Sequence, residues 1–267
     1  MDDFLKTAVC AAKGAGKIIL QGADRLGSLK IEEKSANDFV SEIDRNAEKE
    51  IRNVLLEAYP SHGIVGEEFG SYNTSNNQFS WVIDPLDGTT NFLRGIPHFA
   101  VSIGLIVDGE IKLGVVYDPM KNELYTAVKG GGAQLNGKAI SVRLDGRVEG
   151  GLLATGIPFS GRLLATSDQF ANAMTNLLNE KTAGIRRLGA AALDLAYVAA
   201  GRYDGFWEAG LKQWDIAAGI ILVEEAGGWV SDFQGKNECL VSGNIVACSP
   251  AASAKMLLII GKAYKVS

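Results

Sequence analysis

The spacing of hydrophobic and polar positions divides this chain into predicted helices and strands. Apolar residues recur at helical intervals over residues 3–21 and 43–59, and a proline follows the second stretch. Short apolar runs of strand type follow at 63–66 and 80–83. The Ser/Asn-rich segment Phe69–Phe79 predicts a surface loop. The first third of the chain therefore predicts two helices followed by buried strands.

The stretch after these strands predicts an antiparallel meander. In "HFAVSIGLIVDGEIKLGVVYDP", two strand-like runs flank Asp108-Gly109, a dipeptide that favours a tight hairpin turn. A third strand fits Glu123–Val128, and Asn136-Gly137 marks another turn.

The second half alternates between strand and helix patterns. The predicted strands cover 152–155, 184–188, 204–208, 229–231 and 244–247, and the predicted helices cover 166–180, 190–200, 215–226 and 251–263. No Pro/Gly-rich linker, repeat or low-complexity tract is present. We therefore predict an α+β layered sandwich: a single domain, 1–267, in which halves of about 1–145 and 146–267 share an interface near 140–150.

Composition narrows the classes of protein that the chain could form. Of 267 residues, 47% are apolar and 21% charged, and the net charge of −5 argues against a broad nucleic-acid surface. No apolar run approaches the roughly 20 residues that span a bilayer, and the acidic start is unlike a signal peptide. We expect a soluble cytoplasmic protein with no membrane partner and no direct nucleic-acid partner. Three cysteines without CxxC spacing and only two histidines disfavour zinc, so hydrolytic chemistry would need oxygen ligands.

The stretch "SWVIDPLDGTTNF" places two acids at the end of an apolar run. Pro85 biases Asp84 towards an extended backbone, so Asp84 is predicted to end a strand and the following turn to bring Asp87 back beside it. Two buried carboxylates repel one another, and a hard divalent cation relieves the repulsion. Thr89 is predicted to cap a short helix that starts at Thr90, whose free N–H groups would bind an anion such as phosphate.

Other interpretations fit parts of this stretch. A capped turn without a ligand is an equal alternative on local grounds. An EF-hand loop needs oxygen ligands at alternate positions, which Leu86 and Gly88 interrupt. A haloacid-dehalogenase-type phosphatase would have its two acids two residues apart instead of three. The choice between a capped turn and a metal site therefore depends on the rest of the chain.

Further acids occur where predicted elements begin or end. Glu67 follows the short apolar run in "GIVGEEFG", and Glu208 ends a predicted strand in "DGFWEAG". Asp215 opens a very apolar helix, and Asp44 begins the second predicted helix. From local sequence, Asp215 and Asp44 are each open to two interpretations, as a helix cap or as part of a metal site.

Taken together, "GEEFG", "WVIDPLDGTTNF" and "WDIAAGIILVEEAGG" resemble the three signatures of the inositol monophosphatase family, in the family's order. "GIPHFAVSIGL" and "YDPMKNELYTA" are also typical of that family, so the resemblance covers nearly the whole chain. It implies a layered αβαβα sandwich of the inositol monophosphatase/fructose-1,6-bisphosphatase type. It also implies a magnesium-dependent, lithium-sensitive phosphatase. Three signatures in the right order disfavour a plain capped turn. A catalytically inactive Mg²⁺-binding regulator is disfavoured because every metal acid is present.

The resemblance implies that two to three Mg²⁺ ions bind per site. Glu67, Asp84 and the backbone carbonyl of Leu86 would hold the first ion. The second would be held by Asp84, Asp87 and Asp215, and Glu67 would help to hold a weaker third. The implied mechanism is in-line attack on phosphorus by a metal-activated water.

Three residues are implied in catalysis. Glu67 and Thr89 would position the attacking water, and Asp44 would hydrogen-bond behind Thr89. The residues implied in binding the phosphate or the polyol ring are Asp87, Gly88, Thr89, Gly189, Ala190, Ala191 and Glu208. For the three small residues before the helix, close packing is the alternative explanation.

The implied substrate is inositol monophosphate or a similar polyol phosphate. Relatives with the same signatures hydrolyse fructose 1,6-bisphosphate, histidinol phosphate, NADP or adenosine 3′,5′-bisphosphate. The metal acids do not distinguish these esters, whereas the pocket around Glu208 and the loop Thr155–Arg162 would. The family also implies a homodimer. Some bacterial relatives bind transcription complexes, so a transcription-factor partner, with or without phosphatase activity, is the alternative of another class.

Overall fold

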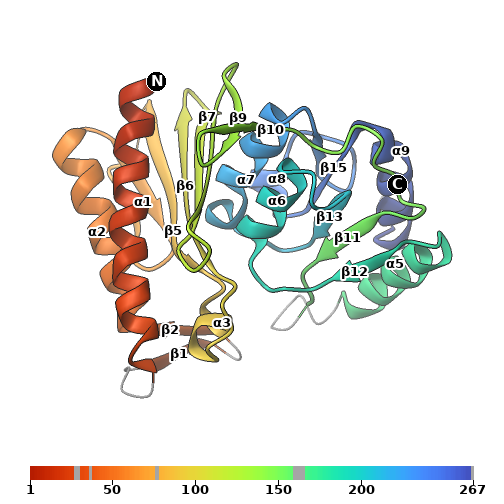
Figure 1. Cartoon of the computed structure of the whole chain (residues 1–267), viewed down its shortest axis with the longest axis horizontal. Coiled ribbons are helices and arrows are strands. Elements are labelled where there is room, and N and C mark those ends of the chain that lie inside the picture. Colours follow the sequence, from red (N-terminus) through yellow and green to blue (C-terminus); the bar gives the residue numbers. More distant parts are fainter. Residues whose placement is uncertain (27–30, 36–37, 76–77, 159–165, 266–267) are drawn as a thin grey trace.

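The computed structural model describes the chain except for residues 27–30, 36–37, 76–77, 159–165 and 266–267, and within 31–40 it describes the backbone alone. Five layers lie side by side in Figure 1: helices, a sheet, helices, a second sheet and helices again. The predicted αβαβα sandwich is thereby confirmed. Among the described residues, no helix combines the length and the apolar character that crossing a membrane requires.

The first helical layer consists of α1 (Asp2–Ala23) and α2 (Glu42–Ala58). Helix α1 buries a stripe of small residues at helical spacing, Ala8, Ala11, Ala12 and Ala15, each fully buried. Helix α2 begins with a capping box, in which the Ser41 and Asp44 side chains bond reciprocally to the first turn. The two helices cover one face of the large sheet.

The large sheet has eight strands in the order β10-β9-β8-β7-β6-β5-β3-β4. They are β3 (Gly63–Gly66), β4 (Gly70–Tyr72), β5 (Phe79–Asp87), β6 (Ala100–Val107), β7 (Glu110–Asp118), β8 (Glu123–Val128), β9 (Gly132–Leu135) and β10 (Lys138–Ile140). Asp108-Gly109 and Asn136-Gly137 all have positive φ, so both predicted hairpin turns are confirmed. The prediction that Phe69–Phe79 is a loop was wrong in part, because β4 pairs there with β3 as an exposed edge strand.

The middle layer consists of α6 (Ala191–Ala199) and α7 (Gln213–Glu225), which lie between the two sheets. Eight consecutive residues of α7, from Ile216 to Val223, are buried, because sheets cover the helix on more than one side. Helix α7 approaches the large sheet at two glycines: a Cβ on Gly104 would lie 3.0 Å from Ala217 Cβ, and one on Gly114 only 2.6 Å from the Ala218 carbonyl. This close approach fixes the start of α7 near the end of β5.

The second sheet has five strands in the order β12-β11-β13-β15-β14. They are β11 (Leu152–Thr155), β12 (Gly184–Arg186), β13 (Gly205–Glu208), β14 (Trp229–Ser231) and β15 (Ile245–Cys248). Its outer face is covered by α5 (Ser167–Asn179) and α9 (Pro250–Ala263). The sequence did not predict β1 (Ile31–Ser35), β2 (Asp38–Ser41) or α8 (Cys239–Ser242), and it placed the start of the short helix α3 (Thr89–Leu93) one residue too late.

Candidate active site

A bulge in β5 brings the two acids of "DPLD" together. Asp84 pairs with Ser102 of β6 and Asp87 with Ala100, so three residue steps on β5 match two on β6. One extra residue restores the alternation that three steps would break, and both acids then lie on the same face. The prediction that the strand ends at Asp84 was therefore wrong, since β5 continues to Asp87. The predicted neighbourhood of the two acids arises from the bulge instead of from a turn.

Glu67 enters the site from the neighbouring parallel strand. Gly66 of β3 pairs with Ile83 of β5, and the Glu67 N–H donates to the Ile83 carbonyl at 3.3 Å. Gly66 and Ile83 are the last pair between the two strands, and Glu67 and Asp84 are the residues that follow them. Glu67 therefore lies beside Asp84. Its charge raises the pKa of Asp84, second only to the effect of burial.

Asp215 reaches the same place from the first turn of α7. The helix begins at Gln213, not at Asp215 as predicted, so Asp215 is its third residue. The Lys212 N–H donates to Asp215 Oδ2 at 2.7 Å, and Ser102 Oγ donates to the Trp214 carbonyl at 3.1 Å, which fastens this turn to β6. The capping hydrogen bond and the proximity to the other acids are both present, so the two interpretations of Asp215 do not exclude each other.

The acids repel one another in the absence of a cation. Burial raises the pKa of Asp84 and of Asp87 well above 3.8, and the neighbouring carboxylates raise both further. Burial raises the pKa of Asp215 to about 6, although a hydrogen bond with the Asp84 side chain opposes the rise. A divalent cation favours the ionised form of each carboxyl, so its binding would lower these raised pKa values.

The donor set fits magnesium in kind. Mg²⁺ takes carboxylate and carbonyl oxygens and keeps several waters or substrate oxygens, so it does not need a closed protein cage. Within the described parts of the chain, no three His, Cys, Asp or Glu side chains converge as a ready-made metal site. Buried carboxylates that raise one another's pKa nevertheless gain from a cation that neutralises them.

Asp44, which is buried, and Thr89, which is half-buried, form a hydrogen-bonded pair behind the acids. Thr89 Oγ1 lies 2.9 Å from Asp44 Oδ1 and 3.0 Å from the Leu86 carbonyl, so its proton is shared between these two acceptors. Both the N–H and the hydroxyl of Ser41 donate to Asp44 Oδ2, at 2.9 and 2.6 Å. Burial raises the pKa of Asp44, while these hydrogen bonds hold it down. Asp44 thus serves its own helix and also reaches Thr89.

The helix after β5 starts one residue earlier than predicted. Helix α3 begins at Thr89, and Gly88, with φ of 92°, occupies the N-cap position without a side-chain cap. The prediction that Thr89 caps the helix was wrong, because its hydroxyl bonds to Asp44 and Leu86 instead. A Cβ on Gly88 would lie 3.0 Å from the His98 carbonyl and 3.3 Å from that of Gly189. Glycine is required here both for the left-handed backbone and for the close approach.

The loop before α6 lies against α3 and Asp87. The Ala192 N–H, in the first turn of α6, donates to Asp87 Oδ2 at 2.7 Å. Asn91 Nδ2 donates to the carbonyls of His98 and Leu188, each at 2.8 Å, and lies 3.4 Å from that of Gly189. The predicted substrate residues Gly189, Ala190 and Ala191 are therefore adjacent to Asp87 and Gly88.

Glu208 ends β13 on the other side of the cluster. Burial and then the charge of Asp215 raise its pKa to about 8, against the opposing effects of Arg187 and a hydrogen bond from Gly156. A small cavity of about 10 Å³ adjoins it, and part of the loop Thr155–Arg162 lines that cavity. The later residues of this loop, 159–162, lie outside the described residues. Glu208 is thus close enough to the cluster of acids for the charge of Asp215 to raise its pKa.

Sequence reasoning missed three residues at this site. Asn91 and Ala192 make the contacts given above through an amide and a backbone N–H, and no local pattern indicates them. Asp194 lies in α6, 1% exposed, and its Oδ1 has no hydrogen-bond partner among the described residues. Burial and then the charges of Glu208 and Asp87 raise its pKa. The sequence feature that could have indicated Asp194 is its position as an acid inside the apolar run "AAALDLA".

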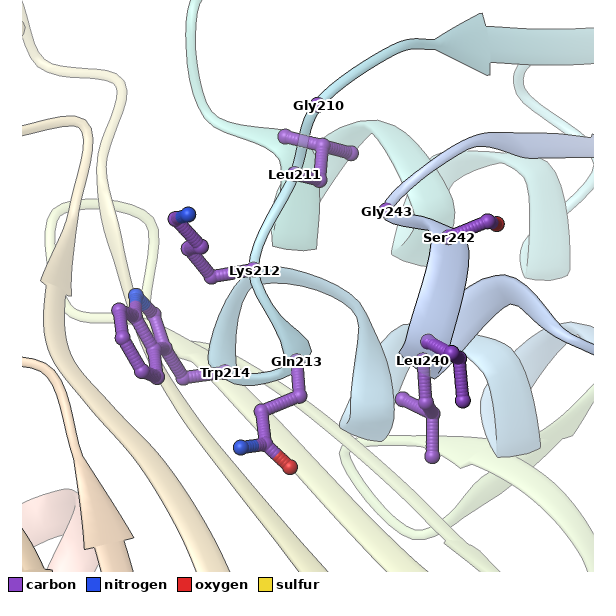
Figure 2. Close-up of a pocket in the computed structure, with 9 residues that line it drawn as sticks. Gly210, Leu211, Lys212, Gln213, Trp214, Leu240, Ser242 and Gly243 are labelled. Atoms are coloured by element: carbon purple, nitrogen blue, oxygen red, sulfur yellow. The ribbon is translucent and has the colours of Figure 1, made fainter.

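A second, larger cavity lies beside the acids, and none of them lines it. It measures about 280 Å³ and is lined by two segments, 210–214 and 240–243. Figure 2 shows Leu240, Ser242 and Gly243 on one side of it, while the side chains of Lys212 and Trp214 extend away from them. The first of these segments leads directly into the turn that carries Asp215. The cavity therefore borders the support of the site and is not the site itself.

In this five-layered sandwich, clustered acids lie where β5 and α7 meet. The sequence profile of the "Inositol monophosphatase family" matches residues 1–265. The chain belongs to the inositol monophosphatase family. Over 249 residues it is 51% identical to Nus factor SuhB of Pseudomonas aeruginosa, covering 92% of each chain.

Solved structures agree with this assignment. The crystal structure of the extragenic suppressor protein suhB from Bartonella henselae matches with a TM-score of 0.92 and 42% identity, over 97% of this chain and 99% of that one. The inositol monophosphatase from Anabaena matches with a TM-score of 0.83 and 34% identity, over 98% of this chain and 96% of that one.

Proposed function

We propose that this protein is a Mg²⁺-dependent phosphomonoesterase that hydrolyses inositol monophosphate and similar polyol phosphates. The observation that carries the proposal is the group of mutually repelling acids, Glu67, Asp84, Asp87 and Asp215, beside the start of α3. Family membership supports the reaction class. The same site would serve fructose 1,6-bisphosphate, histidinol phosphate, NADP or adenosine 3′,5′-bisphosphate, so the substrate has to be measured.

The proposed metal ligands come from three elements. Glu67, Asp84 and the Leu86 carbonyl would hold one ion, and Asp84, Asp87 and Asp215 a second, with Glu67 contributing to a weaker third. When bound, Mg²⁺ supplies positive charge that favours ionised water and stabilises the leaving oxygen. Competition by Li⁺ at these carboxylates would account for lithium sensitivity.

The chain's own groups orient the attacking water. The Thr89 hydroxyl donates a hydrogen bond to Asp44, which leaves a lone pair on Thr89 Oγ1 free to accept a hydrogen bond from water. Glu67 lies near the same end of β5, and its carboxylate would accept a hydrogen bond from that water. The backbone N–H groups of Gly88 and Thr89 would bind phosphate oxygens. The water would lie in line with the ester bond. As its oxygen bonds to phosphorus, the bond to the leaving oxygen breaks, the water gives up one proton, and the leaving oxygen takes one up from solvent to give the free alcohol.

The polyol would lie between Asp87 and Glu208. The loop Gly189–Ala191 would contact its ring, since Asn91 holds that loop against α3. The site takes residues from both proposed halves, 1–145 and 146–267, which we propose work as one phosphatase domain. We further propose a homodimer in the cytoplasm, where small phosphate esters are found.

Phosphate release from a panel of esters tests the proposal. The panel contains inositol 1-phosphate and the four alternative esters named above, each with and without Mg²⁺. We expect Mg²⁺-dependent turnover that falls by at least about 100-fold in Asp84→Asn, because a carboxylate that faces two ions is lost. The best ester identifies the substrate. A folded native protein that releases no phosphate from any ester would overturn the proposal.

A second candidate function is that of a component of transcription complexes, with or without phosphatase activity. The observation that favours it is the name Nus factor carried by a relative 51% identical to this chain. Co-purification with RNA polymerase complexes tests it. A binding role predicts that Asp84→Asn binds as well as the native protein, whereas a purely enzymatic role predicts that neither protein binds.

A further inference from the structure

Helix α2 presents two buried acids to the active site from the same face. Asp44 and Glu48 are four residues apart, so their side chains lie one turn apart along the helix. Both are fully buried. Asp44 reaches Thr89. The function proposed above gives Glu48 no role. Burial of a carboxylate costs free energy unless hydrogen bonds or a cation compensate for it.

Glu48 bonds to the segment that follows Glu67. Its Oε2 accepts from the Glu68 N–H at 2.7 Å, and its Oε1 accepts from the Phe69 N–H at 3.2 Å. On the other side of Glu67, the Glu67 N–H donates to the Ile83 carbonyl at 3.3 Å. The backbone around Glu67 is therefore held between β5 and α2.

The glycine before Glu67 permits this arrangement. A Cβ on Gly66 would collide with Glu48 Oε1, so the carboxylate reaches the loop only where residue 66 has no side chain. Arg52 Nη1, 3.5 Å from the same oxygen, is the nearby cation. The residues of "GEEF" thus combine a close approach, a carboxylate directed at the site and two N–H groups bound from behind.

We propose that Glu48 is a positioning residue, which sets the direction of the Glu67 carboxylate through the N–H groups of Glu68 and Phe69. This inference deepens the proposed function and rests on it. It assigns Glu48 to the affinity for the divalent cation and not to recognition of the polyol. Removal of Glu48 would leave Asp84, Asp87 and Asp215 in place and loosen only the ligand supplied by the loop.

The chain contains a matched control for this arrangement. Glu225, at the end of α7, accepts from the N–H groups of Gly130 and Gly132, each at 2.9 Å. It also joins a helix to a turn through two backbone donors, but that turn lies between β8 and β9, away from the acids. Glu→Gln at either position places an amide N–H against a backbone N–H and loses one of the two bonds.

The experiment compares Glu48→Gln with Glu225→Gln. Calorimetric titration of the metal-depleted proteins with Mn²⁺ gives affinity, and thermal unfolding gives stability. We expect Glu48→Gln to weaken Mn²⁺ binding by about 10-fold, as loss of a group that orients a ligand does, and Glu225→Gln to leave it unchanged. In the Glu67→Gln background, Glu48→Gln should have no further effect on affinity. Glu48→Asp, which keeps the charge but shortens the reach, should show the same loss if Glu48→Gln does not fold.

The outcomes separate this inference from the proposed function. Native Mn²⁺ affinity in folded Glu48→Gln, or an equal loss in both control and test variants, would overturn the positioning role. An additional loss in the Glu67→Gln background would overturn it as well. Weakened binding in Glu48→Gln, without phosphate release by the native protein, would support the positioning of Glu67 and reject the phosphatase.

Discussion

Gly88 shows how one residue combines backbone conformation with close packing. Its φ of 92° and its approach to two carbonyls are separate requirements. Gly109, with φ of 81° and no atom within 4 Å of the position of a Cβ, has the first requirement alone. A comparison of Gly88 with Gly109 therefore separates the free-energy cost of a left-handed backbone from the cost of a steric contact at the Cβ position.

We expect Gly109→Ala to lower the free energy of unfolding by about 1 kcal/mol, the cost of a left-handed alanine. Gly88→Ala should lower it by about 1 kcal/mol more, because the new methyl group meets the His98 carbonyl. Urea unfolding of both variants measures this difference. Equal losses would show that the loop around His98 yields to the methyl group without cost.

At the scale of the residue, the sequence predicts the acids of the site better than the residues and the strand geometry that hold those acids in place. Asp84, Asp87 and Asp215 could be chosen because acids at the ends of apolar runs need an explanation. Their pKa shifts show that the fold brings them together. Ala192 could not be chosen, because its contribution is a backbone N–H that any residue carries. The bulge in β5 could not be predicted from the sequence either, because it arises from the pairing of β5 with β6.

At the scale of the element, Asn91 joins α3 to the loop that precedes α6. Its amide bonds to carbonyls of residues 98 and 188, and it is buried. Helix α3 follows a strand of the large sheet, and the loop before α6 follows a strand of the second sheet, so no strand pairing joins them. One side chain therefore sets the distance between the predicted phosphate and polyol contacts.

We expect Asn91→Asp to lower the free energy of unfolding by about 3 kcal/mol, because a buried carboxylate would face carbonyl oxygens. It should also raise KM for the polyol ester more than it lowers kcat, since the loop moves while the acids stay. Asn136→Asp is the control: Asn136 bonds to the carbonyl of Asn122 and to the N–H of Leu124, exposed and away from the acids. Urea unfolding and steady-state kinetics test both variants, and equal effects would argue against the role of Asn91.

Element boundaries were predictable where the local pattern is strong. β3, β8, β11 and β14 have the bounds that the sequence predicts, because apolar runs end there at turn residues. β4 was missed since an edge strand buries nothing and reads as a polar loop. Helix α8, with four residues, is too short to show a period.

At the scale of the whole molecule, the acids link stability to pH. The folded pKa of Glu208 is about 8 and that of Asp215 about 6, against ordinary values of 4.5 and 3.8. A carboxyl with a raised pKa binds more protons folded than unfolded. Its stabilising contribution is complete below the ordinary value and is lost as pH rises through the folded value.

We therefore expect the melting temperature of the metal-depleted protein to fall as pH rises from about 5 to about 8. Glu208→Gln should flatten the upper part of this fall, because its amide does not ionise. Mg²⁺ should raise the melting temperature more at pH 8 than at pH 5.5, since ionised acids bind it better. Scanning fluorimetry across this range measures all three effects. A metal-free protein whose stability does not change over this range would contradict the linkage.

The fact that Asp84 and Asp215 come from opposite halves of the chain has a consequence for the order of folding. During synthesis, Asp84 leaves the ribosome long before Asp215, and the first sheet can form without meeting the second acid. The repulsion between them arises only when α7 docks on the first sheet, so it opposes that step of assembly. A divalent cation bound between the two acids would offset that repulsion, so it would stabilise the state in which the two halves are docked.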